Sequence, residues 1–402
     1  MRLLAVLPLV PYPPDRGDRM RAWEMITALS SFGELTVAIV ASDATPDALA
    51  ALHQIATDVQ WYRLETQDML LGMAHGVVRG CPVSISRYWS EDIRDRLQGQ
   101  CCGPWDLLLA YQLRAAPYAL GLRSRLRVLD LTDSRALYRR RLPWDSRGVF
   151  QRLALSGVES LEARMSRQFD ACWISTSDDA SSLEQRAGIV PQVIPNGCRP
   201  VLQPRPFRSN GPLVFVGDMH YLPNEDAIVS FVRNVWPVVR RKHRDLRLRI
   251  IGRTTRAVAA LHRTPGIQVT GFLSDVAREL EGASAVINPV RFGTGSSRKV
   301  LGAWAAGRPV ISTRAGVRGL LCRDRDEVML AETPDEWCAS FSWLIDHPAD
   351  AERLGHRGWV HARTVYDAQV IWHRAFSSAL ETMRARPVTT GHPWVTEDAV
   401  QA

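Results

Sequence analysis

The chain has 402 residues, of which 46% are hydrophobic and 23% charged, and its formal net charge is +8. This length exceeds one typical domain and favours two, and the composition is that of a globular protein. The seven cysteines are odd in number and lack metal-ligand spacing, which excludes a disulfide framework and a zinc site. The positive charge favours anionic partners, and the alternative is a well-solvated basic surface.

No apolar stretch approaches the roughly 20 residues needed to span a bilayer. The N-terminal apolar run is short, is interrupted by Pro8 and lacks a small-residue cleavage site, so it predicts a first strand rather than a signal peptide. We therefore expect a cytoplasmic protein whose only membrane contact would be peripheral, at the inner face.

The first half of the chain alternates apolar runs with helical patterns. Strands are expected over residues 2–10, 35–41, 106–111, 127–131 and 171–176, and helices over 18–31 and 149–168. Near-continuous apolar strands separated by helices predict a parallel sheet that is covered on both faces.

A proline-rich stretch with an Asn-Gly turn signal interrupts this alternation over residues 191–212, after which it resumes. Further strands are expected over residues 213–219, 246–253, 267–272, 284–290 and 308–313, and helices over 226–241 and 360–383. The predicted fold class is α/β, with two Rossmann-like, doubly wound domains facing across a cleft. Ligands of such sheets bind at the carboxyl ends of the strands.

We expect five segments along the chain. They are an N-terminal Rossmann-like domain (1–190), a linker (191–212), a C-terminal Rossmann-like domain (213–360), a helix that packs back toward the N-terminal domain (361–384) and a flexible tail (385–402).

The segment PYPPDRGDRM forms a tight turn between the first strand and the first helix. Gly17 lets the backbone approach a ligand closely, and the helix N-terminus offers N–H groups and a positive dipole end to a phosphate. The alternative is an ordinary turn in which Asp15 and Asp18 cap the helix.

The segment FGTGSSRKVL is the strongest local signal in the chain. Gly295, Ser296 and Ser297 precede a helix, a combination that forms a concave anion site. Arg298 and Lys299 lie in the first helical turn, where cations oppose the helix dipole unless an anion compensates them. We expect Lys299 to bind a diphosphate, and the alternative is two solvated charges.

Charged residues also follow two other strands. Arg253 ends one strand and could pair with a phosphate, the alternative being an exposed arginine. Asp130, Asp133 and Arg135 come at the end of another strand. Asp133 is the candidate catalytic residue, because a carboxylate there could accept the proton of an acceptor hydroxyl, and the alternative is a helix cap.

A basic patch flanked by aromatic residues follows Asp133; its members are Arg135, Arg139, Arg140, Arg141, Tyr138 and Trp144. It suits anionic lipid headgroups or a lipid-diphosphate acceptor, and the alternative is a solvated face. No metal-ligand cluster, nucleophile elbow or Walker A loop is present, and we interpret the lone His220 as structural. A nucleic-acid partner is not expected, because no recognition motif accompanies the modest basic excess.

Taken in order, four segments resemble a glycosyltransferase of the two-Rossmann-domain GT-B fold, and most closely family 4, in its subgroup associated with bacterial exopolysaccharide. They are PYPPDRGDRMR, FVGDMHYLPNEDAI, IQVTGFLSDV and FGTGSSRKVLGAWAAGRPVIST, and the similarity spans about residues 2 to 380. The resemblance implies an N-terminal domain on the acceptor side and a nucleotide-sugar donor bound mainly by the C-terminal domain. It also implies transfer without a metal or another cofactor, with retention at the anomeric carbon.

The resemblance also assigns donor-binding residues. Gly17 matches the glycine beside the donor phosphates, and Gly271 with Phe272 matches the turn beside the nucleobase. Lys299 matches the lysine near the diphosphate, and Ser296 with Ser297 matches the small-residue donor loop that follows Gly295.

Several positions depart from the family pattern. Gly302 stands where relatives usually carry a glutamate that binds the donor ribose, and Thr294 stands where many carry an earlier glutamate. Losing one charge-assisted hydrogen bond costs roughly 1.5–3 kcal/mol, which weakens binding without abolishing it. The chain also has no match for the histidine that the family usually carries in its catalytic domain. It lacks the Arg/Lys pair that many relatives carry after the first strand of the second domain, so Arg253 and Lys299 would hold the diphosphate.

The predicted function is transfer of a sugar from a nucleoside-diphosphate sugar to a glycan or lipid-linked glycan, in synthesis of exopolysaccharide or another cell-surface polysaccharide. One alternative is a catalytically impaired binding or scaffold protein of a polysaccharide assembly complex, for which Gly302 would be the sign. A sugar-nucleotide epimerase on the same fold is a further alternative, but it needs several carboxylates and a histidine that the sequence does not offer as a set.

Overall fold

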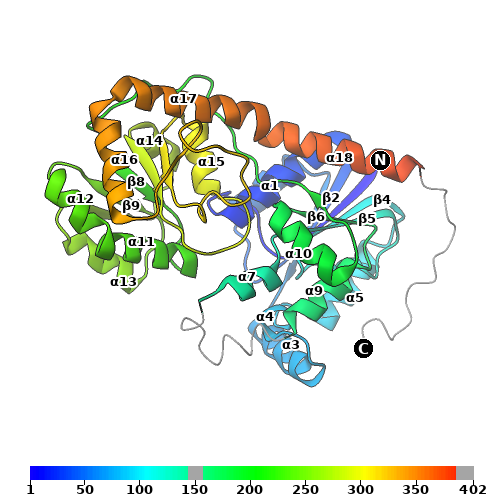
Figure 1. The fold of residues 1–402 in the computed structure, drawn as a ribbon. Helices are drawn as coiled ribbons and strands as arrows, with labels where there is room; N and C mark the ends of the chain where they lie inside the picture. The colour runs from blue at the N-terminus through cyan, green and yellow to red at the C-terminus, as the bar shows by residue number, and fades with distance from the viewer. Residues whose placement is uncertain (144–156, 386–402) are drawn as a thin grey trace. The chain divides into compact units, whose positions relative to one another are not determined.

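The computed structural model describes residues 1–143 and 157–385. The chain divides into two compact units: unit 1 comprises Met1–Ile194 together with the chain from Trp372 onward, and unit 2 comprises Pro195–Ile371. Each unit is built on one parallel sheet flanked by helices (Figure 1). The predicted α/β fold class, with two parallel doubly wound sheets, is confirmed.

Unit 1 contains a seven-stranded sheet in the order β3-β2-β1-β4-β5-β6-β7. Its strands are β1 (Arg2–Leu7), β2 (Glu34–Ala41), β3 (Asp58–Arg63), β4 (Trp105–Tyr111), β5 (Ser124–Thr132), β6 (Ala171–Ile174) and β7 (Gln192–Val193). Its helices are α1 (Gly17–Leu29), α2 (Pro46–His53), α3 (Thr66–Val78), α4 (Val83–Ser86), α5 (Glu91–Gln100), α6 (Ala116–Ala119), α7 (Arg135–Arg141), α9 (Val158–Ser166) and α10 (Ser177–Ala187), with a 3₁₀ turn over Ser30–Phe32. The first half of the helix expected over 149–168 lies outside the described residues.

Unit 2 contains a six-stranded sheet in the order β10-β9-β8-β11-β12-β13. Its strands are β8 (Leu213–Val216), β9 (Leu248–Ile251), β10 (Ile267–Gly271), β11 (Ala285–Asn288), β12 (Val310–Ser312) and β13 (Met329–Leu330). Its helices are α11 (Leu222–Asn234), α12 (Trp236–Lys242), α13 (Arg256–Ala259), α14 (Val276–Glu281), α15 (Arg298–Ala305), α16 (Pro334–Asp346) and α17 (Pro348–Val365), with a 3₁₀ turn over Ala260–Arg263. Helix α18 (Ala368–Ala385) starts in unit 2 and belongs to unit 1 from Trp372 onward.

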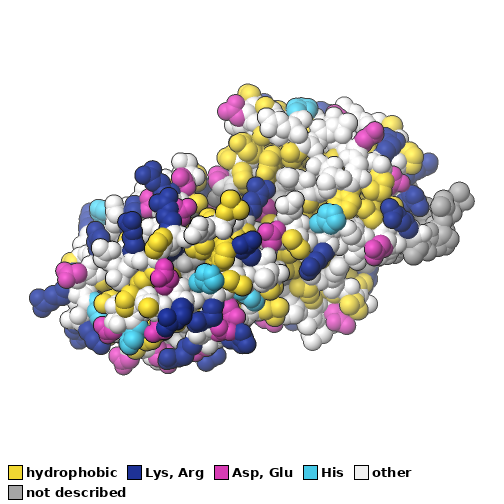
Figure 2. All heavy atoms as spheres, turned by 90° about the horizontal axis from the view of Figure 1, so that it is seen from above, with side chains coloured by type: hydrophobic (Ala, Val, Ile, Leu, Met, Phe, Trp, Pro, Cys, Tyr) yellow, Lys and Arg dark blue, Asp and Glu magenta, His cyan; other side chains and the backbone are white. Residues whose placement is uncertain are grey.

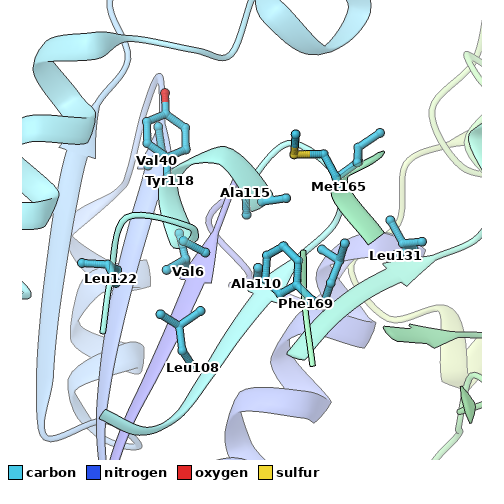
Figure 3. Close-up of a cluster of buried hydrophobic side chains, with 14 of the residues drawn as sticks. Val6, Val40, Leu108, Ala110, Ala115, Tyr118, Leu122, Leu131, Met165 and Phe169 are labelled. Atoms are coloured by element: carbon cyan, nitrogen blue, oxygen red, sulfur yellow. The ribbon is translucent and has the colours of Figure 1, made fainter. Parts of the chain in front are cut away.

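The central strands are apolar on both sides because both faces of each sheet are covered. In β8, Leu213 and Phe215 join one hydrophobic cluster while Val214 joins another. Successive side chains of a strand point to opposite faces, so these two clusters lie on opposite faces of the sheet. In unit 1, Val6 and Leu108 come from neighbouring strands and lie in the same core (Figure 3).

Two expected helices are interrupted. The helix expected over 226–241 is in fact α11 and α12, and Pro237 lies in the first turn of α12. A proline there has no N–H to continue the first helix but is well tolerated at the start of a second. The helix expected over 360–383 is divided near Asp367, which forms a β-bridge with Cys198.

The expected linker makes hydrogen bonds to other parts of the chain. It begins with β7, which pairs with β6, and Asn196 bonds to the loop before α15. Arg308 is 1% exposed and donates hydrogen bonds to the carbonyl groups of Arg205 and Pro206. Much of this segment is therefore part of unit 2.

Candidate functional site

The loop between β11 and α15 has its shape fixed by two asparagines. The backbone N–H of Asn196 donates to the Ser296 hydroxyl over 3.3 Å, and the Asn196 side-chain amide donates to the Ser296 carbonyl over 3.2 Å. The Asn288 amide donates to the Ser297 hydroxyl over 3.2 Å. Gly295 has a φ of +74°, a conformation that glycine adopts without strain.

Ser297 occupies the N-cap position of α15, but its side chain does not cap the helix. Because its hydroxyl accepts a bond from Asn288, it keeps its own proton for donation to a ligand. Ser296 is 7% exposed and is mainly a structural contact to Asn196. Arg298 also bonds to this segment, through the Asn196 side chain and the Gly197 carbonyl.

Lys299 lies in the first turn of α15 and has no carboxylate partner among the residues that the structure describes. Its Nζ lies 5.6 Å from the centroid of the Phe215 ring in β8. A Cβ built on Gly217 would lie 3.3 Å from the lysine Cε, so Gly217 leaves room for the lysine stem. Burial lowers the pKa of Lys299 to about 8. An anion beside this ammonium would offset the free-energy cost of removing it from water.

Arg253, which is predicted to bind phosphate, forms an ion pair with Asp218. Burial of Asp218 opposes its ionisation, but hydrogen bonds from the His220 amide and from Arg253 prevail and lower the pKa of this carboxyl. The exposed His220 ring contacts the same carboxylate over 3.1 Å. A diphosphate at Arg253 would have to share or replace this carboxylate.

The remaining donor-side positions have open space around them. Gly271 ends β10 with a φ of +76°, and no atom lies within 4 Å of a Cβ built on it. Phe272 follows and is 53% exposed. A Cβ on Gly302 would meet only Leu280 Cδ1, at 3.6 Å, which is ordinary van der Waals contact.

In unit 1, Gly17 is the first residue of α1, whose N-cap residue is Arg16. Asp15 pairs with Arg19 over 3.1 Å and Asp18 pairs with Arg16 over 3.3 Å. The N-cap residue Arg16 makes no side-chain cap, but the Asp18 carboxylate accepts the backbone N–H of Arg19 over 2.9 Å and so satisfies one amide of the first turn.

Asp133 lies between β5 and α7 and is half-buried. The helix cap is its neighbour Ser134, whose hydroxyl accepts a hydrogen bond from the Leu137 N–H over 3.1 Å, so the alternative of an Asp133 cap is wrong. Burial, reinforced by the Asp133 charge and opposed by Arg135, raises the pKa of Tyr138 to about 12. Asp133 and Arg135 therefore lie close enough to this phenol to affect its ionisation.

Asp130 is a structural residue and not a site carboxylate. It is fully buried and accepts two hydrogen bonds from Arg21, of 2.9 and 3.1 Å. One of its oxygens also accepts the Thr132 N–H over 2.9 Å. The sequence could not reveal this, because the partner lies 109 positions away.

The expected basic patch is partly neutralised. Arg140 pairs with Glu159 over 3.1 Å and Arg141 pairs with Asp178 over 2.7 Å. Trp144, the last member, lies outside the described residues. On the face shown in Figure 2, Lys and Arg side chains are interspersed with Asp and Glu side chains.

No described helix is both long and apolar enough to cross a bilayer, and the described residues contain no group of three metal-ligating side chains.

Three site features were missed from the sequence. The side-chain oxygens of Asn224 and Asn288 are buried without a hydrogen-bond partner. Asn224 adjoins Gly217, and Asn288 ends β11 next to the donor loop. A polar residue directly after an apolar strand, as at Asn288, was the available signal. The third is Arg114 of unit 1, whose Nε is buried without a hydrogen-bond partner.

Comparison with known proteins agrees with this architecture. Residues 211–347 match the family model described as "Glycosyl transferases group 1". No curated protein sequence matches the chain. Three solved structures are similar to this chain over nearly its whole length. The first is HepE from Anabaena in complex with UDP-glucose, and the second is sucrose-phosphate synthase from Thermosynechococcus elongatus. The third is WaaG, a glycosyltransferase involved in lipopolysaccharide biosynthesis.

The similarity to these three proteins lies in the fold. HepE is 12% identical, with a TM-score of 0.64 over 95% of this chain and 100% of HepE. The synthase is 12% identical, with a TM-score of 0.67 over 96% and 100%. WaaG is 12% identical, with a TM-score of 0.63 over 95% and 100%. The chain thus has the GT-B glycosyltransferase fold, and its second unit carries the match to glycosyl transferases group 1.

Proposed function

We propose that this protein transfers a sugar from a nucleoside-diphosphate sugar to a hydroxyl group of a glycan or lipid-linked glycan. The observation that carries the proposal is Lys299, a half-buried lysine in the first turn of α15 that has no carboxylate partner in the described chain and whose pKa is lowered by desolvation. A diphosphate is the ligand that best compensates such a charge, because a helix N-terminus and an unpaired cation both favour anions.

The chemistry follows from where charge develops. Breaking the bond between the sugar and the diphosphate leaves negative charge on the diphosphate, and the ammonium of Lys299 and the free N–H groups of α15 would stabilise it. The Ser297 hydroxyl can donate a further hydrogen bond. These groups are fixed before the reaction, so they need little rearrangement as the bond breaks.

The residues of unit 1 would serve the acceptor. Asp133, at the carboxyl end of β5, would accept the proton of the attacking hydroxyl. The amides at the start of α1, beginning with Gly17, would contribute to the donor phosphates. Gly271 and Phe272 would border the nucleobase, and Gly302 the ribose.

We further propose that transfer is metal-independent and retaining, and that the product belongs to a bacterial exopolysaccharide or another cell-surface polysaccharide. Support comes from the order of the four family-like segments and from solved structures of this fold, since HepE was crystallised with UDP-glucose. An acceptor carried on a lipid would bring the protein to the cytoplasmic face of a membrane.

A scaffold protein without activity is the second candidate, favoured by the open space at Gly302 where relatives carry a glutamate. The two functions differ in a transfer assay with UDP- and GDP-sugars, monitored by nucleotide release with and without a glycan acceptor. Acceptor-dependent release that is lost in Lys299→Met supports the enzyme. Nucleotide binding without release from any donor supports the scaffold.

A further inference from the structure

In unit 1, Arg87, Arg114 and Arg135 have no carboxylate partner among the described residues. Two of them lie against one aromatic ring. The guanidinium carbon of Arg114 is 4.6 Å from the centroid of the Tyr88 ring, and that of Arg87 is 5.3 Å from it. Several other arginines of unit 1 are neutralised, as Arg125 is by Asp106 over 3.5 Å.

Arg114 is half-buried. Its Nε is buried without a hydrogen-bond partner, and one terminal nitrogen donates to the Gln112 side chain. Burial lowers its pKa, and the positive charge of Arg135 lowers it further. Tyr88, and to a smaller extent Asp18, which is already paired with Arg16, offset this lowering of the pKa only in part. This guanidinium is therefore half-buried and has no carboxylate in direct contact with it among the described residues.

These side chains lie at the carboxyl edge of the unit 1 sheet. Arg114 follows β4 and Arg135 follows the neighbouring β5, directly after Asp133. Gln112 and Thr132, at the ends of the same two strands, adopt φ values of 63° and 68°. Such backbone is uncommon for residues other than glycine, above all for a β-branched one. It fixes the direction in which the chain leaves each strand.

We propose that Arg87, Arg114 and Arg135 bind a phosphate or diphosphate group of the acceptor. A singly charged carboxylate would neutralise only one of the guanidinium groups, whereas a phosphoryl group carries more charge and more acceptor oxygens. Planar guanidinium groups match phosphate geometry in two-bonded contacts. The assignment rests on the proposed transfer reaction, and it places the charged group of the acceptor next to the proposed base Asp133.

The test is titration of the full-length protein with inorganic pyrophosphate in the presence of saturating UDP, which occupies the proposed donor site. We expect Arg114→Gln and Arg135→Gln to bind pyrophosphate about ten- to a hundredfold more weakly than the wild type. Arg125→Gln, at the opposite end of β5 and already paired, is the matched control and should bind as the wild type does. Equal affinity in all four proteins would overturn the proposal.

Stability separates a ligand-binding role from a structural one. Without pyrophosphate, the thermal unfolding midpoint of Arg114→Gln should equal or exceed that of the wild type, because the substitution removes an unpaired, partly desolvated charge. Pyrophosphate should raise the unfolding midpoint of this variant by less than it raises that of the wild type. A lower midpoint together with an undiminished gain would make Arg114 structural. If UDP fails to bind, the donor proposal fails, but the comparison of pyrophosphate affinities still decides this one.

A second experiment distinguishes a lipid from a soluble source of the phosphoryl group. Phosphatidylcholine vesicles with and without an isoprenyl diphosphate are compared with a soluble sugar 1-phosphate. Binding to the diphosphate vesicles that Arg114→Gln weakens supports a lipid-linked acceptor. Binding of the sugar phosphate alone, weakened in the same variant, supports a soluble one. Failure of the wild type to bind either would contradict the proposal.

Discussion

Arg21 and Asp130 form a two-bonded ion pair that is completely buried in unit 1, with N–O distances of 2.9 and 3.1 Å. The pair joins α1 to β5, and the Trp372 ring of α18 lies 4.7 Å from the guanidinium carbon. The ring face attracts a cation, so three elements distant in sequence meet at one arginine.

Asp130→Asn should therefore destabilise the protein strongly. Breaking a buried pair leaves Arg21 charged and uncompensated, which costs about 3–5 kcal/mol of unfolding free energy. Asp95→Asn, which breaks the exposed pair with Arg94, should cost at most about 1 kcal/mol. Denaturant unfolding monitored by Trp fluorescence measures both. Equal small losses would show that the buried pair adds nothing beyond a surface pair.

Lys299 is one of two lysines in the chain, the other being the exposed Lys242. After reductive methylation with ¹³C-formaldehyde, the lysine signals are few enough to assign by NMR with Lys299→Arg. We expect a pKa of about 8 for Lys299 in the free protein, lowered by burial, and a higher value once UDP binds. A Lys299 signal whose titration is the same with and without UDP would argue against contact with the diphosphate.

The same group gives nucleotide binding a pH dependence. Above pH 8 the free protein loses the Lys299 proton, so UDP affinity should fall, by up to about tenfold per pH unit. Lys299→Arg keeps its charge, so its UDP affinity should change less with pH.

The free energy of unfolding has the opposite pH trend. Because the pKa is lowered in the folded state, the unfolded chain holds more protons above pH 8, and this group makes stability rise with pH there.

Gly302 offers a gain-of-function test. Gly302→Ala should stabilise the protein by up to about 1 kcal/mol, since a Cβ there meets only ordinary contact. Gly302→Glu should bind the nucleotide about tenfold more tightly or better if the residue faces the ribose, and Gly302→Gln should gain less. Gly358→Ala is the steric control and should destabilise, because its Cβ would lie 2.4 Å from the Trp304 ring.

Asp133→Asn should lower kcat by about a hundredfold or more, because an amide cannot accept the proton of the acceptor hydroxyl. UDP affinity should stay the same. The helix cap is Ser134, so Ser134→Ala is the contrasting variant and should lose about 1 kcal/mol of stability. Acceptor-dependent release of UDP measures kcat. An Asp133→Asn enzyme with full activity would remove Asp133 as the base.

The fold was readable from the sequence wherever strands are apolar on both faces, as in β1 and β4. Strand β3 was missed because it is mostly polar and only partly buried. The expected helix over 226–241 ignored Pro237, although a proline inside a helical pattern is a known interruption.

The sequence predicted the candidate site only where neighbouring residues of one segment form it, as in the loop before α15. The same types of residue had different roles where the partner is distant in sequence. Asp130 pairs with Arg21, and Arg253 pairs with Asp218. Arg114 stands out only once its lack of a counter-charge is visible. Tertiary contacts, which local sequence does not contain, decide between a structural and a functional charge.

The measurement that tests the donor site most directly is isothermal titration calorimetry of UDP and GDP with the wild type, Lys299→Met and Lys242→Met. The wild type and Lys242→Met should bind one of the nucleotides equally well. Lys299→Met should bind it about ten- to a hundredfold more weakly, with no loss of thermal stability. Unchanged nucleotide affinity in Lys299→Met would contradict the assignment of this lysine to the diphosphate.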